Sequence, residues 1–279
     1  MFSTTSPSGD RKIPSVFIEE RRFLKNVTTK TIAWYEQTFK VFDGALESRE
    51  SINQRIVSLR QRGISPVSIN SWTRCINAFL RWAGSDIKIP RLTEEKKILR
   101  TFTPEDIRRL VNHKTKSKSQ QRIQHLALLL LDTGLRIAEA LALRSTDVDL
   151  DNFLIRVQGK GRKERLIPFS LAGRKTLYQL CRKGGYLFPT RGGTLSVRNA
   201  QRDLAKLCER AGIRGVRCSP HTLRHSFACH YLKAGGNVEY LRRCLGHSNI
   251  LTTQRYLQSV QPTDPQKIHN DLSPLGRSL

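Results

Sequence analysis

The chain has 279 residues, which is long enough for two domains that each bury a hydrophobic core. Its 49 Lys and Arg residues outnumber its 23 Asp and Glu residues, and the resulting net charge of +26 favours a polyanionic partner, of which duplex DNA is the usual one. The basic residues are spread over both halves of the chain, which argues against a ribosomal or RNA-coating protein with charged tails.

Several other classes of protein are disfavoured by what the sequence lacks. No apolar segment follows the opening MFSTTSPSGDRK, so no signal peptide is expected, and the longest apolar run, Leu126 to Leu131, is too short to cross a bilayer. The six cysteines include no C-x-x-C pair, and an EF-hand starting at Asp147 would find Asn152 and Gln158 where it needs Gly and Glu. We therefore expect no metal, no cofactor and no membrane partner, and a cytoplasmic setting.

The first part of the chain has a basic, helical pattern after a polar stretch. Residues 1–13 are predicted to be a flexible N-terminus, and residues 14–85 a helical domain. Apolar residues at helical spacing predict four short helices, over residues 17–27, 29–44, 48–62 and 65–84. The same spacing indicates that the aromatic residues of this part belong to its core and do not stack on bases: Trp34, Tyr35, Phe39, Trp72 and Trp82.

A charged stretch with a proline, residues 86–101, is predicted to be a linker, and a capped helix start at Thr103-Pro104-Glu105-Asp106 opens the second domain. A buried helix then ends at Asp132-Thr133-Gly134, and the next helix has Arg136 in its first turn. The helix dipole favours an anion at that end, so a phosphate bound there would suit both the helix and Arg136, with Glu139 holding the guanidinium.

A β-hairpin is predicted next. Residues 153–157 alternate between apolar and polar, GKGRKE turns the chain, and residues 165–169 return it. The turn carries Lys160 between two glycines, where an ammonium group can swing, and Lys163 is the fallback. A brief strand at 186–188 and a helix over 196–211 follow.

The densest group of chemically competent residues lies in three short helical patterns between Ser219 and Gln258. The first carries His221 and Arg224 three residues apart, His247 follows the second, and Tyr256 lies on the third. Arginine pairs bidentately with phosphate oxygens, histidine exchanges protons near neutral pH, and a tyrosine hydroxyl assisted in this way can attack a phosphodiester. Each residue alone is more often structural, so the inference depends on the whole set.

These motifs resemble a known family. HTLRHSFACHYL followed by LGHSNILTTQRY resembles the C-terminal signature of the tyrosine recombinases, the integrase and Xer-like family. TGLRIAEALALRSTDVDL resembles the family's first arginine box, and VQGKGRKERLIPF its hairpin lysine. The resemblance implies six catalytic residues: Arg136, Lys160, His221, Arg224, His247 and Tyr256. It gives no part in the reaction to His225 or His230, which are interpreted as structural.

The resemblance also implies a mainly α fold with a small β-sheet in the C-terminal domain, in which two domains form a DNA clamp. Residues 14–85 would be the SAM-like core-binding domain and 102–261 the catalytic domain. The tail, residues 262–279, would be a segment exchanged between subunits. The expected partners are double-stranded DNA and three further copies of the chain, in a homotetramer on two DNA sites. An accessory DNA-bending or directionality protein would be an additional partner.

The function implied is site-specific recombination, in which DNA is cut and rejoined through a 3′-phosphotyrosyl intermediate without metal or ATP. It would serve integration, excision or resolution of a DNA element, in association with the nucleoid. Two alternatives stay open: a type IB topoisomerase-like enzyme that relaxes DNA, and a DNA-binding protein without catalytic activity. The target sequence, the element served and the directionality cannot be read from the residues.

Overall fold

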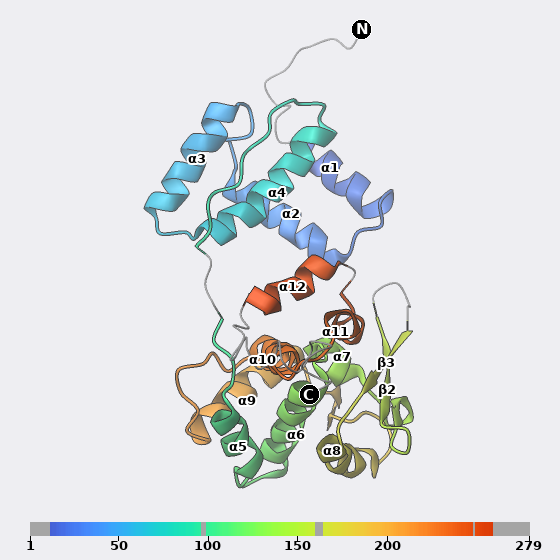
Figure 1. Ribbon diagram of the computed structural model, residues 1–279. Helices are drawn as coiled ribbons and strands as arrows, with labels where there is room; N and C mark the ends of the chain where they lie inside the picture. The colour runs from blue at the N-terminus through green and yellow to red at the C-terminus, as the bar shows by residue number, and fades with distance from the viewer. Residues whose placement is uncertain (1–11, 96–98, 160–163, 248, 259–279) are drawn as a thin grey trace, which may run out of the picture. The chain divides into compact units, whose positions relative to one another are not determined.

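The computed structural model describes residues 12–95, 99–159, 164–247 and 249–258 (Figure 1). The chain divides into two compact units, residues 1–97 and residues 98–279. Helices dominate both units and the strands belong to the second, which confirms the predicted fold class. Among the described residues, no helix combines the length and the apolarity that crossing a membrane requires.

The described part of the first unit contains four helices, of which the last three lie close to the ranges predicted, whereas the first begins at Lys12, within the stretch predicted to be flexible, and ends at Phe23. They are α1 (Lys12–Phe23), α2 (Thr29–Val41), α3 (Arg49–Gln61) and α4 (Pro66–Trp82). The hydroxyls of Thr28, Ser48 and Ser65 accept hydrogen bonds from backbone N–H groups in the first turns of α2, α3 and α4. These caps satisfy donors that a helix cannot satisfy itself, which explains where the helices begin.

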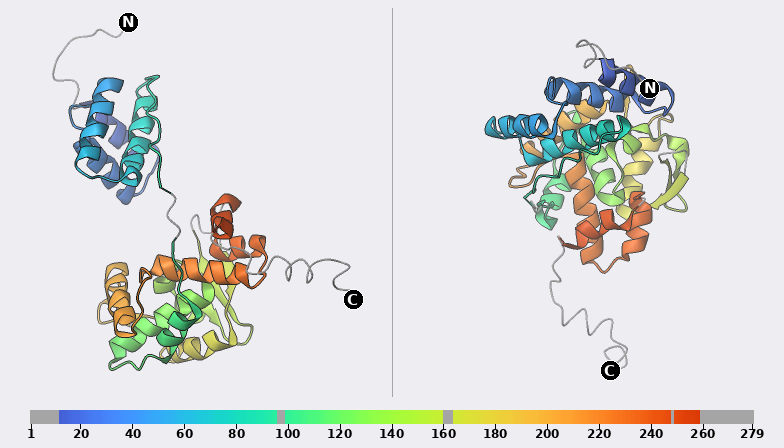
Figure 2. Two further views of the ribbon diagram at one scale, coloured as in Figure 1. Left: turned by 60° about the vertical axis from the view of Figure 1, so that its left-hand side comes forward. Right: turned by 90° about the horizontal axis from the view of Figure 1, so that it is seen from above.

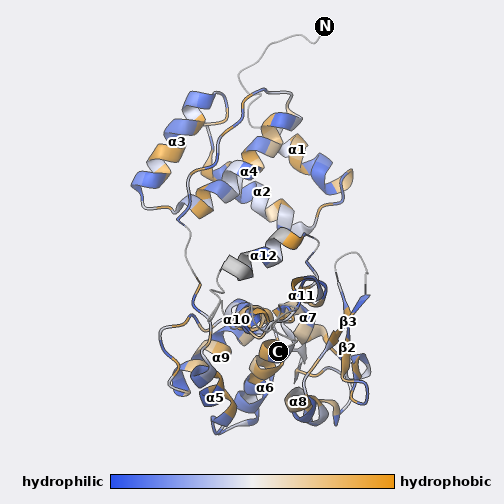
Figure 3. Ribbon diagram, viewed as in Figure 1, coloured by the Kyte–Doolittle hydropathy of each residue, from blue (hydrophilic) through white to orange (hydrophobic). Residues whose placement is uncertain are grey.

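Aromatic packing holds α1, α2 and α4 together. Phe17 is fully buried, and its ring lies 5.2 to 6.0 Å, edge-on, from those of Tyr35, Phe39, Phe79 and Trp82. Such edge-to-face contacts add to the burial of apolar area. Apolar and polar residues alternate along each helix, as expected of helices with one buried face (Figure 3). The prediction that these aromatics form core is confirmed.

The second unit has more elements. In chain order they are α5 (Pro104–Asn112), α6 (Lys118–Thr133), α7 (Ile137–Ala142), the 3-10 turn η1 (Ser145–Asp147), β1 (Val148–Asp149), β2 (Leu154–Gln158), β3 (Glu164–Pro168), α8 (Leu171–Cys181), β4 (Pro189–Thr190), β5 (Gly193–Thr194), α9 (Val197–Arg210), α10 (Pro220–Lys233), α11 (Val238–Leu245) and α12 (Ile250–Gln258). The strand expected at 186–188 is wrong, because Tyr186 forms an isolated bridge with Arg144 and the short strands lie just beyond it.

Helix α6 lies at the centre of this unit, against α8, α9 and α10. Its buried side chains join a continuous core with those of the antiparallel sheet β1-β2-β3. At its edge, α11 packs on β3, and α12 packs on both α10 and α11 (Figures 1 and 2). The ends of α6, α10, α11 and β3 are therefore brought close to one another, and the residues singled out by the sequence lie there.

Two glycines make this close approach feasible. Gly134 ends α6 and Gly246 ends α11. Each has a positive φ (64° and 63°), which residues with a Cβ atom disfavour. A Cβ on Gly134 would overlap the ring of Phe227, and one on Gly246 would press on the guanidinium of Arg165. The two turns can therefore lie directly against α10 and β3.

Candidate functional site

Arg136 is fixed at the start of α7. It is the N-cap residue, one position before the first turn in which it was expected. Its Nη1 atom lies 2.9 Å from Oε1 of Glu139, and its backbone N–H donates to the other carboxylate oxygen at 2.9 Å. Its Nη2 atom donates to the carbonyl oxygen of Gly246 at 3.1 Å. The side chain is 45% exposed, so the guanidinium is anchored yet open to an incoming ligand.

Glu139 joins Arg136 to a third arginine. Nη2 of Arg165, on β3, lies 2.8 Å from Oε2 of Glu139, and Nε of Arg165 donates to the Cys244 carbonyl at 3.0 Å. Burial raises the pKa of Glu139, but the hydrogen bonds from Arg165 and Arg136 outweigh it, so the pKa lies below its usual range. Glu139 is therefore a carboxylate that orients two arginines, as predicted for the first of them.

Arg224 is a buried cation, 5% exposed. Its Nη1 atom donates to the Gly134 carbonyl and its Nη2 atom to the Leu245 carbonyl, both at 2.7 Å. In the described part of the chain no carboxylate lies within ion-pair distance of it. Burial, followed by the charge of Arg136, lowers the pKa of Arg224 to about 10. Because a buried charge without a counter-ion is costly, this arrangement favours a bound anion.

His247 lies against Arg224. Its Nε2 atom is 2.9 Å from Nη2 of Arg224, and its Nδ1 atom is 3.0 Å from the hydroxyl of Thr253. A guanidinium can only donate, so Nε2 must accept and Nδ1 carries the proton, which it donates to Thr253. Burial, followed by the charges of Arg224 and Arg136, lowers the pKa of His247 to about 4. The imidazole is therefore neutral near pH 7.

Tyr256 is 8% exposed and packs against imidazoles. Its ring is stacked on that of His247, with centroids 6.2 Å apart and an interplanar angle of 15°. Burial raises the pKa of Tyr256, while the charge of Arg224 and a hydrogen bond with it oppose the shift. The phenol oxygen thus lies beside the buried guanidinium, where an anion bound to Arg224 would meet it.

His221 and Lys160 stand apart from this group. His221 is an exposed residue in the first turn of α10, one turn before Arg224. Partial burial, followed by the charges of Arg224 and Arg217, lowers the pKa of His221. Lys160, with its fallback Lys163, lies outside the described residues. The structure therefore brings together Arg136, Arg224, His247 and Tyr256, with His221 one helical turn away.

Three residues of the site were missed from the sequence. Arg165 holds Glu139, Thr253 fixes the tautomer of His247, and Arg242 donates to the His247 carbonyl at 2.6 Å. Arg165 stands in the quoted motif VQGKGRKERLIPF, but its place on a predicted strand gives no sign of a polar contact. Only the contact of β3 with α11 reveals it.

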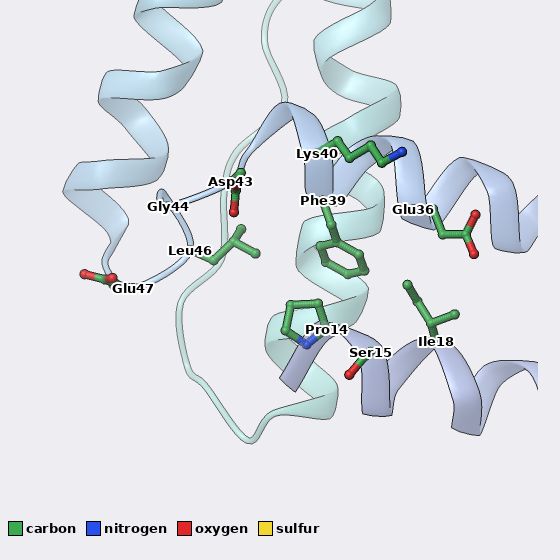
Figure 4. Close-up of a pocket in the computed structure, with 10 residues that line it drawn as sticks. All are labelled: Pro14, Ser15, Ile18, Glu36, Phe39, Lys40, Asp43, Gly44, Leu46 and Glu47. Atoms are coloured by element: carbon green, nitrogen blue, oxygen red, sulfur yellow. The ribbon is translucent and has the colours of Figure 1, made fainter. Parts of the chain in front are cut away.

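A groove of about 650 Å³ lies elsewhere, within the first unit. Figure 4 shows Phe39 of α2 pointing toward α1, where Pro14 and Ile18 lie. Carboxylates border it, which disfavours a phosphate ligand there: Glu36, Asp43 and Glu47. Among the described residues, no group of three or more His, Cys, Asp or Glu side chains is placed to hold a metal ion.

Comparison with known proteins agrees with the geometry. The model of the phage integrase family matches residues 100–261, which cover the whole site. The chain belongs to this family, the tyrosine recombinases. It is 33% identical to tyrosine recombinase XerA of Thermococcus kodakarensis over 241 residues, covering 82% of this chain and 83% of that protein. It is 28% identical to tyrosine recombinase XerC of Xanthomonas campestris pv. campestris, covering 91% and 87%.

Solved structures share the fold of this tyrosine recombinase. The Tn1549 transposon integrase in complex with circular intermediate DNA superposes with a TM-score of 0.77 at 19% identity, covering 94% of this chain and 99% of that chain. The XerH site-specific recombinase bound to a palindromic difH substrate gives a TM-score of 0.63 at 20% identity, covering 88% and 77%.

Proposed function

We propose that the chain is a site-specific DNA recombinase that cuts and rejoins duplex DNA through a covalent 3′-phosphotyrosyl bond to Tyr256. The observation that carries the proposal is the stacking of the Tyr256 ring on His247, whose Nε2 atom contacts the buried, uncompensated guanidinium of Arg224. The net charge of +26 and membership of the tyrosine recombinase family support it.

The reaction is a transesterification at phosphorus. The phenol oxygen of Tyr256 attacks the scissile phosphate, the bond from phosphorus to the 5′ oxygen breaks, and a 5′ hydroxyl is released. Arg136 and Arg224 neutralise the non-bridging oxygens as negative charge grows on them. The energy of the broken ester is retained in the protein–DNA bond, so a 5′ hydroxyl from a second duplex can reverse the step, and no ATP or metal is needed.

Proton transfers complete the scheme. The phenol proton passes to His221 or His247, and Lys160 protonates the leaving 5′ oxygen. In the free protein the lone pair on Nε2 of His247 is directed at Arg224. A phosphate bound by Arg224 raises the pKa of His247, since it adds a negative charge beside it, and lets Nε2 become protonated and donate to a phosphate oxygen.

The resemblance to the tyrosine recombinases also suggests how copies of the chain assemble on DNA. Residues 14–85 form the core-binding domain and residues 102–261 the catalytic domain of a clamp on duplex DNA, with residues 86–101 as the linker. Four copies act on two DNA sites, and the tail 262–279 is exchanged between them. The basic residues in both halves of the chain support contact with DNA by each domain.

Substitution of the nucleophile tests the proposal. A nicked suicide substrate traps the covalent adduct, because the short strand released after cleavage diffuses away and cannot be rejoined. Tyr256→Phe is expected to bind this DNA yet form no adduct, while Tyr178→Phe, at an exposed tyrosine on α8, keeps wild-type adduct formation. An adduct in Tyr256→Phe would remove Tyr256 from its role.

The two alternatives make different predictions in related assays. A relaxing enzyme would form the adduct but would not join strands from two labelled duplexes. A binding protein without catalytic activity would shift the DNA in a gel and give no covalent species with the wild-type chain.

A further inference from the structure

His225, the residue after Arg224, has no part in the reaction described above, yet it touches the nucleophile. It is 5% exposed, and its ring centroid lies 5.2 Å from that of Tyr256 at an angle of 41°. We propose, on the basis of the proposed function, that His225 is a positioning residue whose ring holds the Tyr256 hydroxyl on Arg224. The ring in turn is anchored to the backbone at Leu99.

The anchoring of His225 is specific. Its Nε2 atom lies 3.3 Å from the Leu99 carbonyl oxygen, which can only accept, so Nε2 carries the proton and donates it. The same Nε2 atom lies 3.7 Å from the buried thiol of Cys229, one turn further along α10. Burial lowers the pKa of His225, and the bond to Leu99 only partly opposes this, so the ring is neutral near pH 7. A neutral, buried imidazole can pack against the ring of Tyr256 and donate a hydrogen bond at the same time.

The segment that contains Leu99, to which His225 is hydrogen-bonded, is itself hydrogen-bonded to α10. The hydroxyl of Ser226 accepts from the backbone N–H of Phe102 at 2.9 Å, and Nε2 of His230 donates to the Phe102 carbonyl at 2.7 Å. Phe102 is fully buried in the core of the second unit. The Leu99 carbonyl is therefore a fixed point, and His225 transmits its position to the tyrosine ring.

Tyr256 depends on such support. Its ring contacts two imidazoles: His247 is oriented by Arg224 and Thr253, and His225 by Leu99. If the ring of His225 were removed, the space left beside Tyr256 would let the phenol move away from Arg224. A displacement of about 1 Å at a reacting group can lower a rate by about 100-fold.

The experiment compares single-turnover cleavage of the suicide substrate with DNA affinity and melting temperature in three variants at this position. His225→Ala removes both the ring and the donor, His225→Phe keeps a ring of similar size, and His225→Gln keeps a donor near the position of Nε2. We expect His225→Ala and His225→Gln to cleave about 10- to 100-fold more slowly, and His225→Phe to stay within about 3-fold of the wild type. The dissociation constant for DNA should change by less than about 2-fold.

His125→Ala is the matched control, since it removes a partly buried imidazole from α6 that takes no part in the contacts from Leu99 to Tyr256. It is expected to lower the melting temperature and to leave cleavage within about 2-fold of the wild type. Wild-type cleavage by His225→Ala would overturn the inference. So would a loss that His225→Gln restores and His225→Phe does not, because the hydrogen bond alone would then matter. A wild-type chain that forms no adduct would instead refute the proposed function.

Discussion

Nε2 of His247 accepts a hydrogen bond from Nη2 of Arg224 at 2.9 Å, so in the free protein a histidine stands where a phosphate oxygen would bind. Arg224 lies on α10 and His247 in the turn after α11, 23 positions further along the chain. Arg224, which is buried and has no carboxylate partner among the described residues, thus donates to a neutral imidazole. An anion that binds Arg224 would replace His247 as the acceptor of this hydrogen bond. Its negative charge would also favour protonation of the imidazole.

The first prediction concerns the pH dependence of stability. The pKa of His247 is about 4 in the folded chain against its ordinary 6.5, so the unfolded state binds more protons between these values. The contribution of His247 to stability is complete above pH 6.5 and is lost as the pH falls toward 4. Melting temperatures measured from pH 7.5 to pH 4.5 should fall less steeply for His247→Gln than for the wild type.

A matched control isolates this effect, since burial also lowers the pKa of His125, on α6 and away from the arginines. His125→Gln should remove its own contribution and leave that of His247, so the double variant should flatten the profile further. Parallel profiles for His247→Gln and the wild type would contradict a neutral His247 in the fold.

The second prediction concerns Arg165, which the resemblance does not place in the site. Arg165→Met leaves Glu139 without one of its partners and the Cys244 carbonyl without its donor. Loss of a partner from a buried polar group costs about 1–3 kcal/mol, and chemical denaturation should report a decrease of that size. Cleavage should slow as well, because Glu139 then has a freer geometry in which to hold Arg136.

Arg156→Met is the control for this change, at an exposed arginine on the paired strand β2. Like Arg165→Met, it removes one positive charge from the sheet. It should leave the free energy of unfolding within about 0.5 kcal/mol of the wild type. Equal effects of the two substitutions would show that charge, and not the contact with Glu139, decides the outcome.

The third prediction separates two roles of Gly246. Gly246 and Gly235 both follow helices with positive φ (63° and 84°), but a Cβ on Gly246 would meet Arg165, whereas one on Gly235 would meet nothing within 4 Å. Gly235→Ala should therefore cost about 1 kcal/mol from backbone strain alone. Gly246→Ala should cost more and should also slow cleavage, since the turn carries the carbonyl that anchors Arg136 and leads to His247.

A similar cost for both variants, with normal cleavage by each, would show that the turn after α11 adapts to the added methyl. The free energy of unfolding from urea titration and the single-turnover cleavage rate would be measured on the same preparations.

The features that the sequence predicts depend on residues close together in the chain, whereas those that it misses depend on contacts between distant residues. The helix starts at Thr103 and Ser219 follow from side-chain caps within four residues, and the hairpin follows from alternation, so both are local. The anchors of Arg136 and Arg224 are backbone carbonyls of Gly246 and Leu245, more than 20 residues away. Any residue type offers a carbonyl, so no spacing in the sequence could reveal these contacts.

The fourth prediction concerns the geometry of Arg224. Its two terminal nitrogens reach the carbonyls of Gly134 and Leu245 at once, which a single ammonium group cannot do while also binding phosphate. Arg224→Lys should therefore lower the cleavage rate by about 100- to 1,000-fold, the range seen when one donor to a developing charge is lost. Arg210→Lys, at an exposed position on α9, should cleave normally. Because either lysine keeps the net charge, DNA affinity at fixed salt should stay close to that of the wild type, and cleavage by Arg224→Lys at the wild-type rate would mean that charge alone suffices.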